Sequence, residues 1–284
     1  MRDVLNDLTT VATHFNRLVA EQAARQPLPP VQTVAESDLA HLPAPVAHYL
    51  RRAGVVGRPR IHNFVVEMQA RLNRGPGQPS MDTTVLQVSF VDHPTRLFLL
   101  RTAMHGLPVS GLHQYGDAGA SMEIRVLGLL PIVNASGDAF AHAETVTVLN
   151  DFCVLAPAVL IDDRFRWHAV NDEAAKVTFH NGEQVVSATM HFDTHGDLTN
   201  FSSTDRHVLD ADGVRWTTPL RAYHEFGVAR LASEGDAIWH YDDQPDWCYG
   251  TFTIARVRYN VPTHELPQAK HLTEIARTSF QPFA

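Results

Sequence analysis

The sequence has few of the residues from which familiar catalytic and cofactor motifs are built. Its only cysteines are Cys153 and Cys248, too few for a disulfide framework and too widely spaced for a zinc or redox motif. The sequence leaves open whether these two form a disulfide. No Gly-x-Ser-x-Gly nucleophile elbow occurs, and no glycine-rich stretch has the strand-to-helix setting and lysine of a phosphate loop. We therefore expect no cofactor.

Basic runs and long apolar runs are also missing. The chain carries 31 acidic and 23 basic residues, a formal net charge of −8, and no cluster of Lys or Arg that could follow a phosphate backbone or an anionic membrane. Residues 1–26 mix acids and bases and lack the uninterrupted apolar stretch of a signal peptide or spanning helix. These absences predict a cytoplasmic protein with no nucleic-acid partner and no membrane span.

The first 56 residues are predicted to form a helical lead-in. Val11, Phe15, Leu18 and Val19 follow the three- and four-residue spacing of an amphipathic helix that begins near residue 3 and ends before the prolines of residues 27–30. A second short helix is expected to end at Gly54, since glycine commonly terminates helices. The apolar stripe of the first helix requires a surface on which to pack.

From Ile61 onward the apolar period changes from helical to two, which is typical of strands. We expect residues 57–284 to form an antiparallel β domain, with the glycine-rich residues 106–119 as an irregular loop or broken strand. Residues 138–155 interrupt this pattern with a helical apolar face, although the run 145–148 is rich in β-branched residues. Together with the lead-in, the chain is predicted to be a single structural domain.

A flat open sheet of about ten strands, with one internal helix, would leave its faces and edges exposed to solvent, which is unfavourable. Such a sheet usually curls, and the helix then packs across its concave side. The fold class that we expect is mostly β (α+β), with a curved antiparallel sheet or half-barrel that encloses a cavity.

Five segments resemble, in order, a bacterial family known only as a domain of unknown function. The likeness covers roughly residues 40–260, and none of the segments is a catalytic signature. It implies a curved sheet like that of the lipoprotein-carrier half-barrels, with no established activity, cofactor or site residues. Relatives often have membrane-spanning N-termini, from which this sequence departs. The segments are Leu42–Leu50, Leu155–Leu160 followed by Trp167, Phe192-Asp193 with Gly196, Asp205-Arg206, and Arg258-Tyr259-Asn260.

The sharpest polar signal is Asp205-Arg206, at the end of a strand that begins at Leu198. Adjacent strand residues point to opposite faces, so one of the two is expected to face the cavity. A buried Arg can bind a carboxylate through two hydrogen bonds, and a buried Asp can act as a base. The alternative is a structural ion pair. If the protein is an enzyme, His168 and His224 are further acid–base candidates.

Aromatic residues gather in the C-terminal half of the chain. At alternate positions of a curved sheet they could line a pocket that offers apolar area and a few OH and NH groups. They could equally fill the core. The ligand-binding candidates are Trp167, Tyr223, Trp239 and Tyr249.

Histidine is unusually frequent, with 17 copies. His191, Asp193 and His195 would project from one face of a regular strand, and imidazole and carboxylate are ligand types that suit zinc or iron. However, residues 194–197 have the sequence of a hairpin turn, which would rotate His195 away. We therefore predict a hairpin here and no metal site.

Three functions are compatible with the sequence. We favour the binding of an apolar or amphipathic small molecule between the concave sheet and the helix of residues 138–155. The alternative is a cofactor-independent isomerase, cyclase or hydrolase that uses the same cavity for an apolar substrate. A third possibility is an interaction module whose N-terminal helix packs on a second copy, forming a homo-oligomer.

Overall fold

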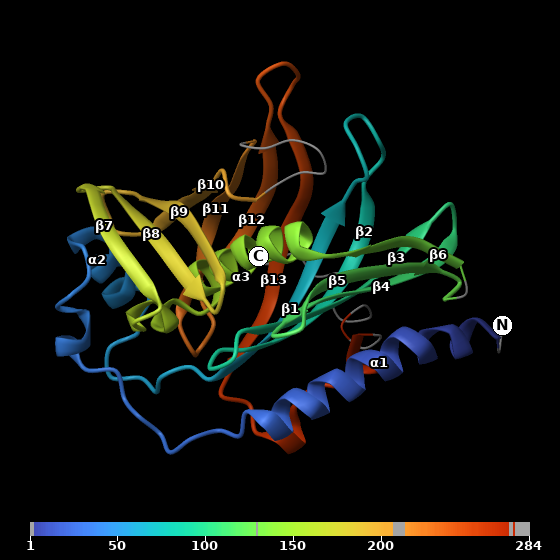
Figure 1. Cartoon of the computed structure of the whole chain (residues 1–284), viewed down its shortest axis with the longest axis horizontal. Coiled ribbons are helices and arrows are strands. Elements are labelled where there is room, and N and C mark those ends of the chain that lie inside the picture. The colour runs from blue at the N-terminus through green and yellow to red at the C-terminus, as the bar shows by residue number, and fades with distance from the viewer. Residues whose placement is uncertain (1–2, 129, 207–213, 273–274, 276–284) are drawn as a thin grey trace. The chain divides into compact units, whose positions relative to one another are not determined.

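The computed structural model describes residues 3–128, 130–206, 214–272 and 275 (Figure 1). The helices are α1 (Asp3–Arg25), α2 (Ala44–Arg52) and α3 (Asp138–Leu155), with short 3₁₀ helices at Glu36–Leu39, Pro157–Ile161 and Thr263–Glu265. The strands are β1 (Asn63–Leu72), β2 (Met81–Phe90), β3 (Thr95–Met104), β4 (Leu107–Gly116), β5 (Gly119–Val126), β6 (Leu130–Ser136), β7 (Phe165–Asn171), β8 (Ala174–Asn181), β9 (Gln184–Phe192), β10 (Leu198–Ser203), β11 (Arg215–Glu225), β12 (Arg230–His240) and β13 (Trp247–Tyr259).

The described strands form one antiparallel sheet in the order β6-β5-β4-β3-β2-β1-β13-β12-β11-β10-β9-β8-β7. Its edge strands are β6 and β7, and most neighbours follow each other directly in the chain, as expected for hairpins. The predicted class, a mostly antiparallel β protein with an N-terminal helix and one internal helix, is confirmed.

Two compact units divide the chain. The first comprises residues 1–29, 62–141 and 252–284, and the second comprises residues 30–61 and 142–251. Strand β13 therefore contributes its beginning to the second unit and its end to the first. The expected division at residue 56, into a lead-in and a β domain within a single structural domain, stays a prediction.

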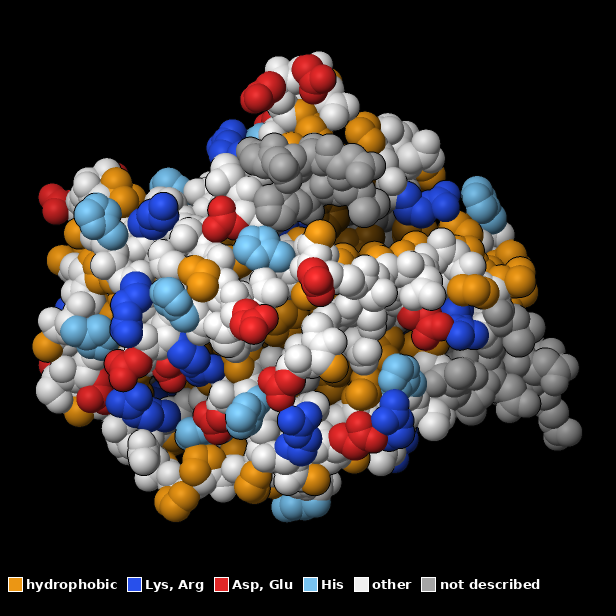
Figure 2. Space-filling model, in the orientation of Figure 1, with side chains coloured by type: hydrophobic (Ala, Val, Ile, Leu, Met, Phe, Trp, Pro, Cys, Tyr) orange, Lys and Arg blue, Asp and Glu red, His pale blue; other side chains and the backbone are white. Residues whose placement is uncertain are grey.

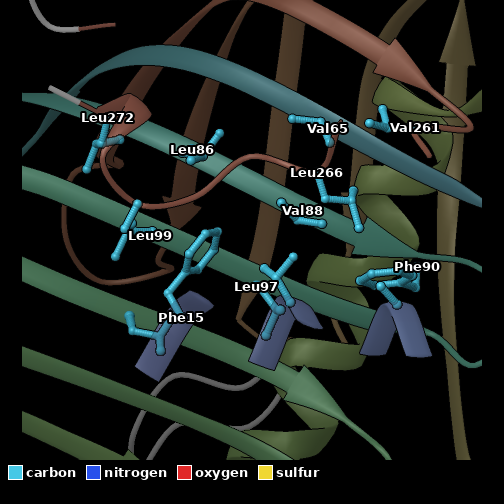
Figure 3. Packing of buried hydrophobic residues seen from close by; sticks show 14 of the residues in the cluster. Phe15, Val65, Leu86, Val88, Phe90, Leu97, Leu99, Val261, Leu266 and Leu272 are labelled. Atoms are coloured by element: carbon cyan, nitrogen blue, oxygen red, sulfur yellow. The ribbon is translucent and has the colours of Figure 1, made fainter. Parts of the chain in front are cut away.

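In the first unit, α1 lies against strands β1–β4 and supplies the surface that its apolar stripe requires (Figures 1 and 3). Phe15 is completely buried and points toward Leu97 and Leu99. Burial of each such large apolar side chain contributes about 1.5–3 kcal/mol. The end of the helix is fixed by Gln26, whose amide accepts a hydrogen bond from the backbone N–H of His93 (2.8 Å) and donates one to its carbonyl (3.1 Å).

In the second unit, α3 contacts strands on both of its sides. Asn150 donates a hydrogen bond to Thr218 of β11 (2.6 Å), whereas Phe152 packs edge-on against Phe165 of β7 and Phe179 of β8. Residues two apart in a helix point about 200° apart around its axis. Because β8 and β11 are separated by β9 and β10, one helix can touch both with opposite sides only if these strands bend around it. The expected curvature is therefore present in this unit.

The glycine-rich residues 106–119 are not an irregular loop, and this prediction is wrong. They contain strand β4, joined to β3 by a two-residue turn in which His105 and Gly106 both have positive φ (51° and 79°), as in a type I′ hairpin. Gly111 lies within the strand at a close approach, because a Cβ there would lie 3.1 Å from Cγ of Leu100 on β3. Glycine here serves a hairpin and a close approach of strands, not a loop.

Both cysteines are free thiols, so the pairing that the sequence left open does not form. Cys153 is buried in α3, and its burial, with the nearby Asp151 carboxylate, raises the pKa of its thiol. Cys248 is exposed at the start of β13. Among the helices of the described ranges, none combines the length and apolarity needed to cross a membrane.

Candidate functional site

Three of the predicted site residues, Arg206, Trp239 and Tyr249, lie together in the second unit. Their neighbours come from α3, β11 and β13. We call this group the Arg206 cluster, and its members are Arg206, Glu144, Thr147, Trp216, Trp239, Trp247 and Tyr249.

Strand register places the aromatic rings of the cluster side by side. Ser203, the last residue of β10, is paired with Trp216 on β11, and Trp216 is paired with Trp239 on β12. Directly paired residues share one face of a sheet. Tyr249 extends the row, with its ring stacked on that of Trp239 at a centroid distance of 6.4 Å. Arg206, three residues beyond the end of β10, thus reaches a row of rings.

The guanidinium of Arg206 is held by polar and aromatic partners at once. It donates hydrogen bonds to the hydroxyls of Thr147 (Nε, 3.1 Å) and Tyr249 (Nη1, 3.1 Å). Nη2 donates to the carboxylate of Glu144 at 3.4 Å. Its central carbon lies 4.5 Å from the ring centroid of Trp216 and 5.2 Å from that of Trp239. Cation–π contacts of this kind strengthen when water is excluded.

Burial varies across the cluster and leaves one side more open. Trp216 and Trp239 are 3% and 6% exposed, and the Arg206 side chain is 14% exposed. Tyr249 and Trp247 are only half-buried. Burial alone would lower the pKa of Arg206, but the neighbouring Tyr249 and Glu144 raise it, so the guanidinium remains charged.

The side chains of Asp205 and Arg206, which follow the end of β10, have different partners. The Asp205 carboxylate accepts a hydrogen bond from the backbone N–H of Ser187 on β9 (2.7 Å). Its own N–H donates to the hydroxyl of Ser203 (3.1 Å). Asp205 therefore links the end of β10 to β9, while Arg206 turns toward α3.

Tyr223 belongs to a separate group at the other end of β11. Its hydroxyl donates to the carbonyl of Leu198 (2.8 Å), and its ring lies 4.6 Å below the guanidinium of Arg230. Arg230 and Arg52 together bind the carboxylate of Asp197. We call Arg52, Asp197 and Arg230 the carboxylate brace, because it joins α2, the β9–β10 turn and β12.

The other sequence-predicted candidates do not join either group. Trp167 lies on the edge strand β7 and donates its indole N–H to the carbonyl of Leu160 at 3.4 Å. His168 is exposed on the same strand, and His224 is exposed on β11. Of the four acid–base candidates of the enzyme hypothesis, only Arg206 is a member of the Arg206 cluster.

The segment around Asp193 is a hairpin turn, as predicted. The Asp193 carboxylate accepts hydrogen bonds from the backbone N–H groups of His195 (2.9 Å) and Asp197 (2.8 Å), a pattern that stabilises turns. His191 remains on β9, where burial and the charge of Arg215 lower its pKa.

A hydroxyl–imidazole–carboxylate chain on β11 and β12 was missed by sequence reasoning. Nε2 of His240 lies 2.8 Å from the hydroxyl of Thr217, and its Nδ1 lies 2.6 Å from the carboxylate of Asp246. A carboxylate only accepts, so Nδ1 donates to Asp246, while Nε2 is hydrogen-bonded to the hydroxyl of Thr217. Thr217 is 2% exposed, which places its hydroxyl out of reach of a substrate. The chain thus fastens the β12–β13 loop to β11.

Charged side chains of both signs are interspersed on the face shown in Figure 2, and the described residues there gather into no patch of a single sign. This agrees with the absence of basic runs from the sequence. It gives no electrostatic reason to expect a polyanionic partner at that face.

Comparisons with known proteins give a family but no activity. The search of curated proteins found no match. Among solved structures, similar chains include an outer membrane lipoprotein-sorting protein domain, so described, from Vibrio parahaemolyticus (10% identity, TM-score 0.39, covering 76% of this chain and 91% of that one). Another is a DUF1329 family protein from Desulfovibrio piger (11% identity, TM-score 0.37, covering 77% and 92%). Likenesses at this level say nothing about a ligand.

The family model described as "Family of unknown function (DUF6544)" matches residues 32–252. This range contains four of the five segments that carried the resemblance, and it contains the Arg206 cluster and the carboxylate brace. The resemblance to a family of unknown function is confirmed. The chain belongs to the DUF6544 family.

Proposed function

We propose that this protein binds an apolar or amphipathic small molecule at the Arg206 cluster, between α3 and strands β11–β13. The observation that carries the proposal is a buried guanidinium packed on the rings of Trp216, Trp239 and Tyr249. Aromatic area with a few fixed polar groups is the usual lining of small-molecule sites.

The polar part of a ligand would meet Arg206. A guanidinium has five N–H groups, and three of them donate to described partners. The remaining two could donate to a ligand that reaches the open side of the cluster. The apolar part would lie on Tyr249 and Trp247, the half-buried rings of the group.

The first half of α3 is a better place for a ligand than the second half. Near its C-terminal end, Phe152 fills the space against Phe165 and Phe179, with ring centroids 6.2 and 5.8 Å away. Side chains packed in this way fill the space between helix and strands, so a ligand has no room there. Glu144 and Thr147 in the first half of α3, by contrast, hydrogen-bond to Arg206.

The enzyme alternative has less support. The Asp205 carboxylate accepts from Ser187, and His168 and His224 are exposed on β7 and β11, so acid–base chemistry at the cluster would have to use Glu144 or Tyr249. The proposal includes the cytoplasmic location expected from sequence, since free thiols are usual in reducing compartments. A homo-oligomer stays a prediction.

Native mass spectrometry of protein purified from a bacterial host tests the proposal. We expect an intact mass that exceeds the mass after organic extraction, and we expect this excess to disappear in Arg206→Met. Arg221→Met is the matched control, because Arg221 is an exposed arginine of the same unit that pairs with Glu234 and Asp236. Equal retention by Arg206→Met, or an unchanged wild-type mass together with no binding of added apolar probes, would contradict the proposal.

A further inference from the structure

We infer that the ligand of the Arg206 cluster is a flat apolar molecule with a neutral hydrogen-bond acceptor, such as an amide, ketone or ester carbonyl, and not an ionised carboxylate. This inference rests on the proposed function and specifies the chemical class of its ligand. It follows from the charge balance, the supply of donors and the geometry of the rings.

The charge of Arg206 is already balanced within the cluster. Glu144 is 2% exposed and lies 3.4 Å from the guanidinium. A ligand carboxylate would add a second negative charge beside this buried one and would lose its own hydration. A cationic ligand would meet the positive charge of Arg206. A neutral polar group disturbs the balance least.

The groups that face the ligand are mainly donors. Two N–H groups of Arg206 remain after its three hydrogen bonds. The hydroxyl of Tyr249 accepts from Arg206, so its own hydrogen can be donated. A ligand that supplies acceptor oxygens would therefore match the donors that Arg206 and Tyr249 still offer.

The rings favour a flat molecule. Trp239 and Tyr249 are stacked with an interplanar angle of 29°, and Trp247 lies 5.8 Å from Tyr249 between centroids. A planar ring can continue this row on the half-buried side, where offset stacking is favourable. A flexible chain would gain less from each contact and would lose more conformational entropy on binding.

The experiment compares three probes that share one ring and differ in one substituent: 1-naphthamide, 1-naphthoate and 1-methylnaphthalene. Isothermal titration calorimetry at pH 7 should give a dissociation constant for 1-naphthamide at least tenfold below those of the other two. In Glu144→Gln, which removes the balancing charge, 1-naphthoate should bind at least tenfold more tightly than to wild type. Glu234→Gln, a change at an exposed carboxylate in the same unit, should leave the order of the three probes unchanged.

The outcomes separate the inference from the proposed function. If wild type prefers 1-naphthoate, or if 1-methylnaphthalene binds as tightly as 1-naphthamide, the inference is overturned while small-molecule binding stands. If none of the three probes binds, and the native mass is unchanged by extraction, both are overturned. The wild-type order of the probes decides the matter even where Glu144→Gln fails to fold.

Discussion

Asp197 illustrates how one residue fixes three segments of the second unit. Its carboxylate accepts hydrogen bonds from Nε of Arg52 (2.6 Å) and Nη2 of Arg230 (2.8 Å), and its side chain is 12% exposed. Burial alone would raise the pKa of Asp197, but the hydrogen bonds and charges of Arg230 and Arg52 lower it below its ordinary value. A carboxyl with a lowered folded-state pKa stabilises the protein above its unfolded pKa, and this contribution is lost as pH falls through the folded value.

We therefore predict that Asp197→Asn lowers the free energy of unfolding by about 2–3 kcal/mol at pH 7, because it leaves two arginines without a counter-charge. The difference from wild type should shrink below about pH 4, where the unfolded chain protonates first. Urea unfolding at several pH values measures both effects. Asp236→Asn, at the exposed pair with Arg221, should change stability by less than about 1 kcal/mol. A difference that stays constant down to pH 2.5 would contradict the prediction.

At this same scale, the sequence predicted part of the candidate site. Arg206, Trp239 and Tyr249 were among the candidates, but strand alternation does not account for the different partners of Asp205 and Arg206, because both residues lie beyond the end of β10. Glu144 was not identified and Trp216 was not chosen as a binding candidate, because their proximity depends on the position of α3 and on strand register, neither of which a residue pattern specifies. His240 and Asp246 were missed for the same reason: the chain they form with Thr217 spans two strands and a loop.

At the scale of an element, the β9–β10 turn depends on Gly196. This residue has a φ of +86°, and a Cβ there would lie 2.7 Å from Nδ1 of His48 on α2. We predict that Gly196→Ala destabilises the protein by about 2–3 kcal/mol, of which about 1–2 kcal/mol is backbone strain and the rest is crowding of His48. Chemical unfolding monitored by circular dichroism measures the effect.

A second glycine separates the two contributions. Gly182, in the β8–β9 turn, has a φ of +60° and open space where its Cβ would be, so Gly182→Ala should show only the strain of about 1–2 kcal/mol. Replacing His48 with Ala in the Gly196→Ala background should reduce the loss to the same size. If Gly196→Ala and Gly182→Ala are equally destabilising from the start, the exposed His48 ring simply moves aside and the crowding argument is wrong.

Most elements were predictable where a single period dominates. The apolar stripes of α1 and α3 predicted where these helices lie. Helix α3 forms despite its β-branched run because most of its residues after Ala141 are buried, and tertiary packing outweighs weak helix propensity. Strand β4 was misjudged because its glycines were interpreted as loop residues, although Gly106 belongs to a turn and Gly111 to a close strand contact. Strand β6 was not predicted: its exposed Leu130 and Ile132 are interrupted by Pro131, which is tolerated on an edge strand.

At the scale of the whole molecule, the tryptophans are unevenly distributed. All four lie between residues 142 and 251, the longer segment of the second unit. Tryptophan emission therefore follows the unfolding of this unit, whereas far-UV circular dichroism follows the strands of both. Thermal unfolding without ligand is followed by calorimetry, by tryptophan emission and by circular dichroism. A calorimetric transition that coincides with the change in tryptophan emission includes the unfolding of the second unit, and one seen by circular dichroism alone belongs to the first unit.

This assignment permits a test of ligand binding by linkage. A ligand that binds only the folded protein adds about 2.7 kcal/mol of stability at a free concentration one hundred times its dissociation constant. For a chain of this size that corresponds to a rise of about 5–10 °C in the unfolding midpoint. We predict such a rise for 1-naphthamide in the calorimetric transition that tryptophan emission follows, in wild type and in Arg221→Met. In Arg206→Met the same concentration should give at most about half of this rise, since loss of the guanidinium donors should weaken binding at least tenfold. An equal shift in Arg206→Met would mean that the probe binds elsewhere, and the Arg206 cluster would then not be the binding site.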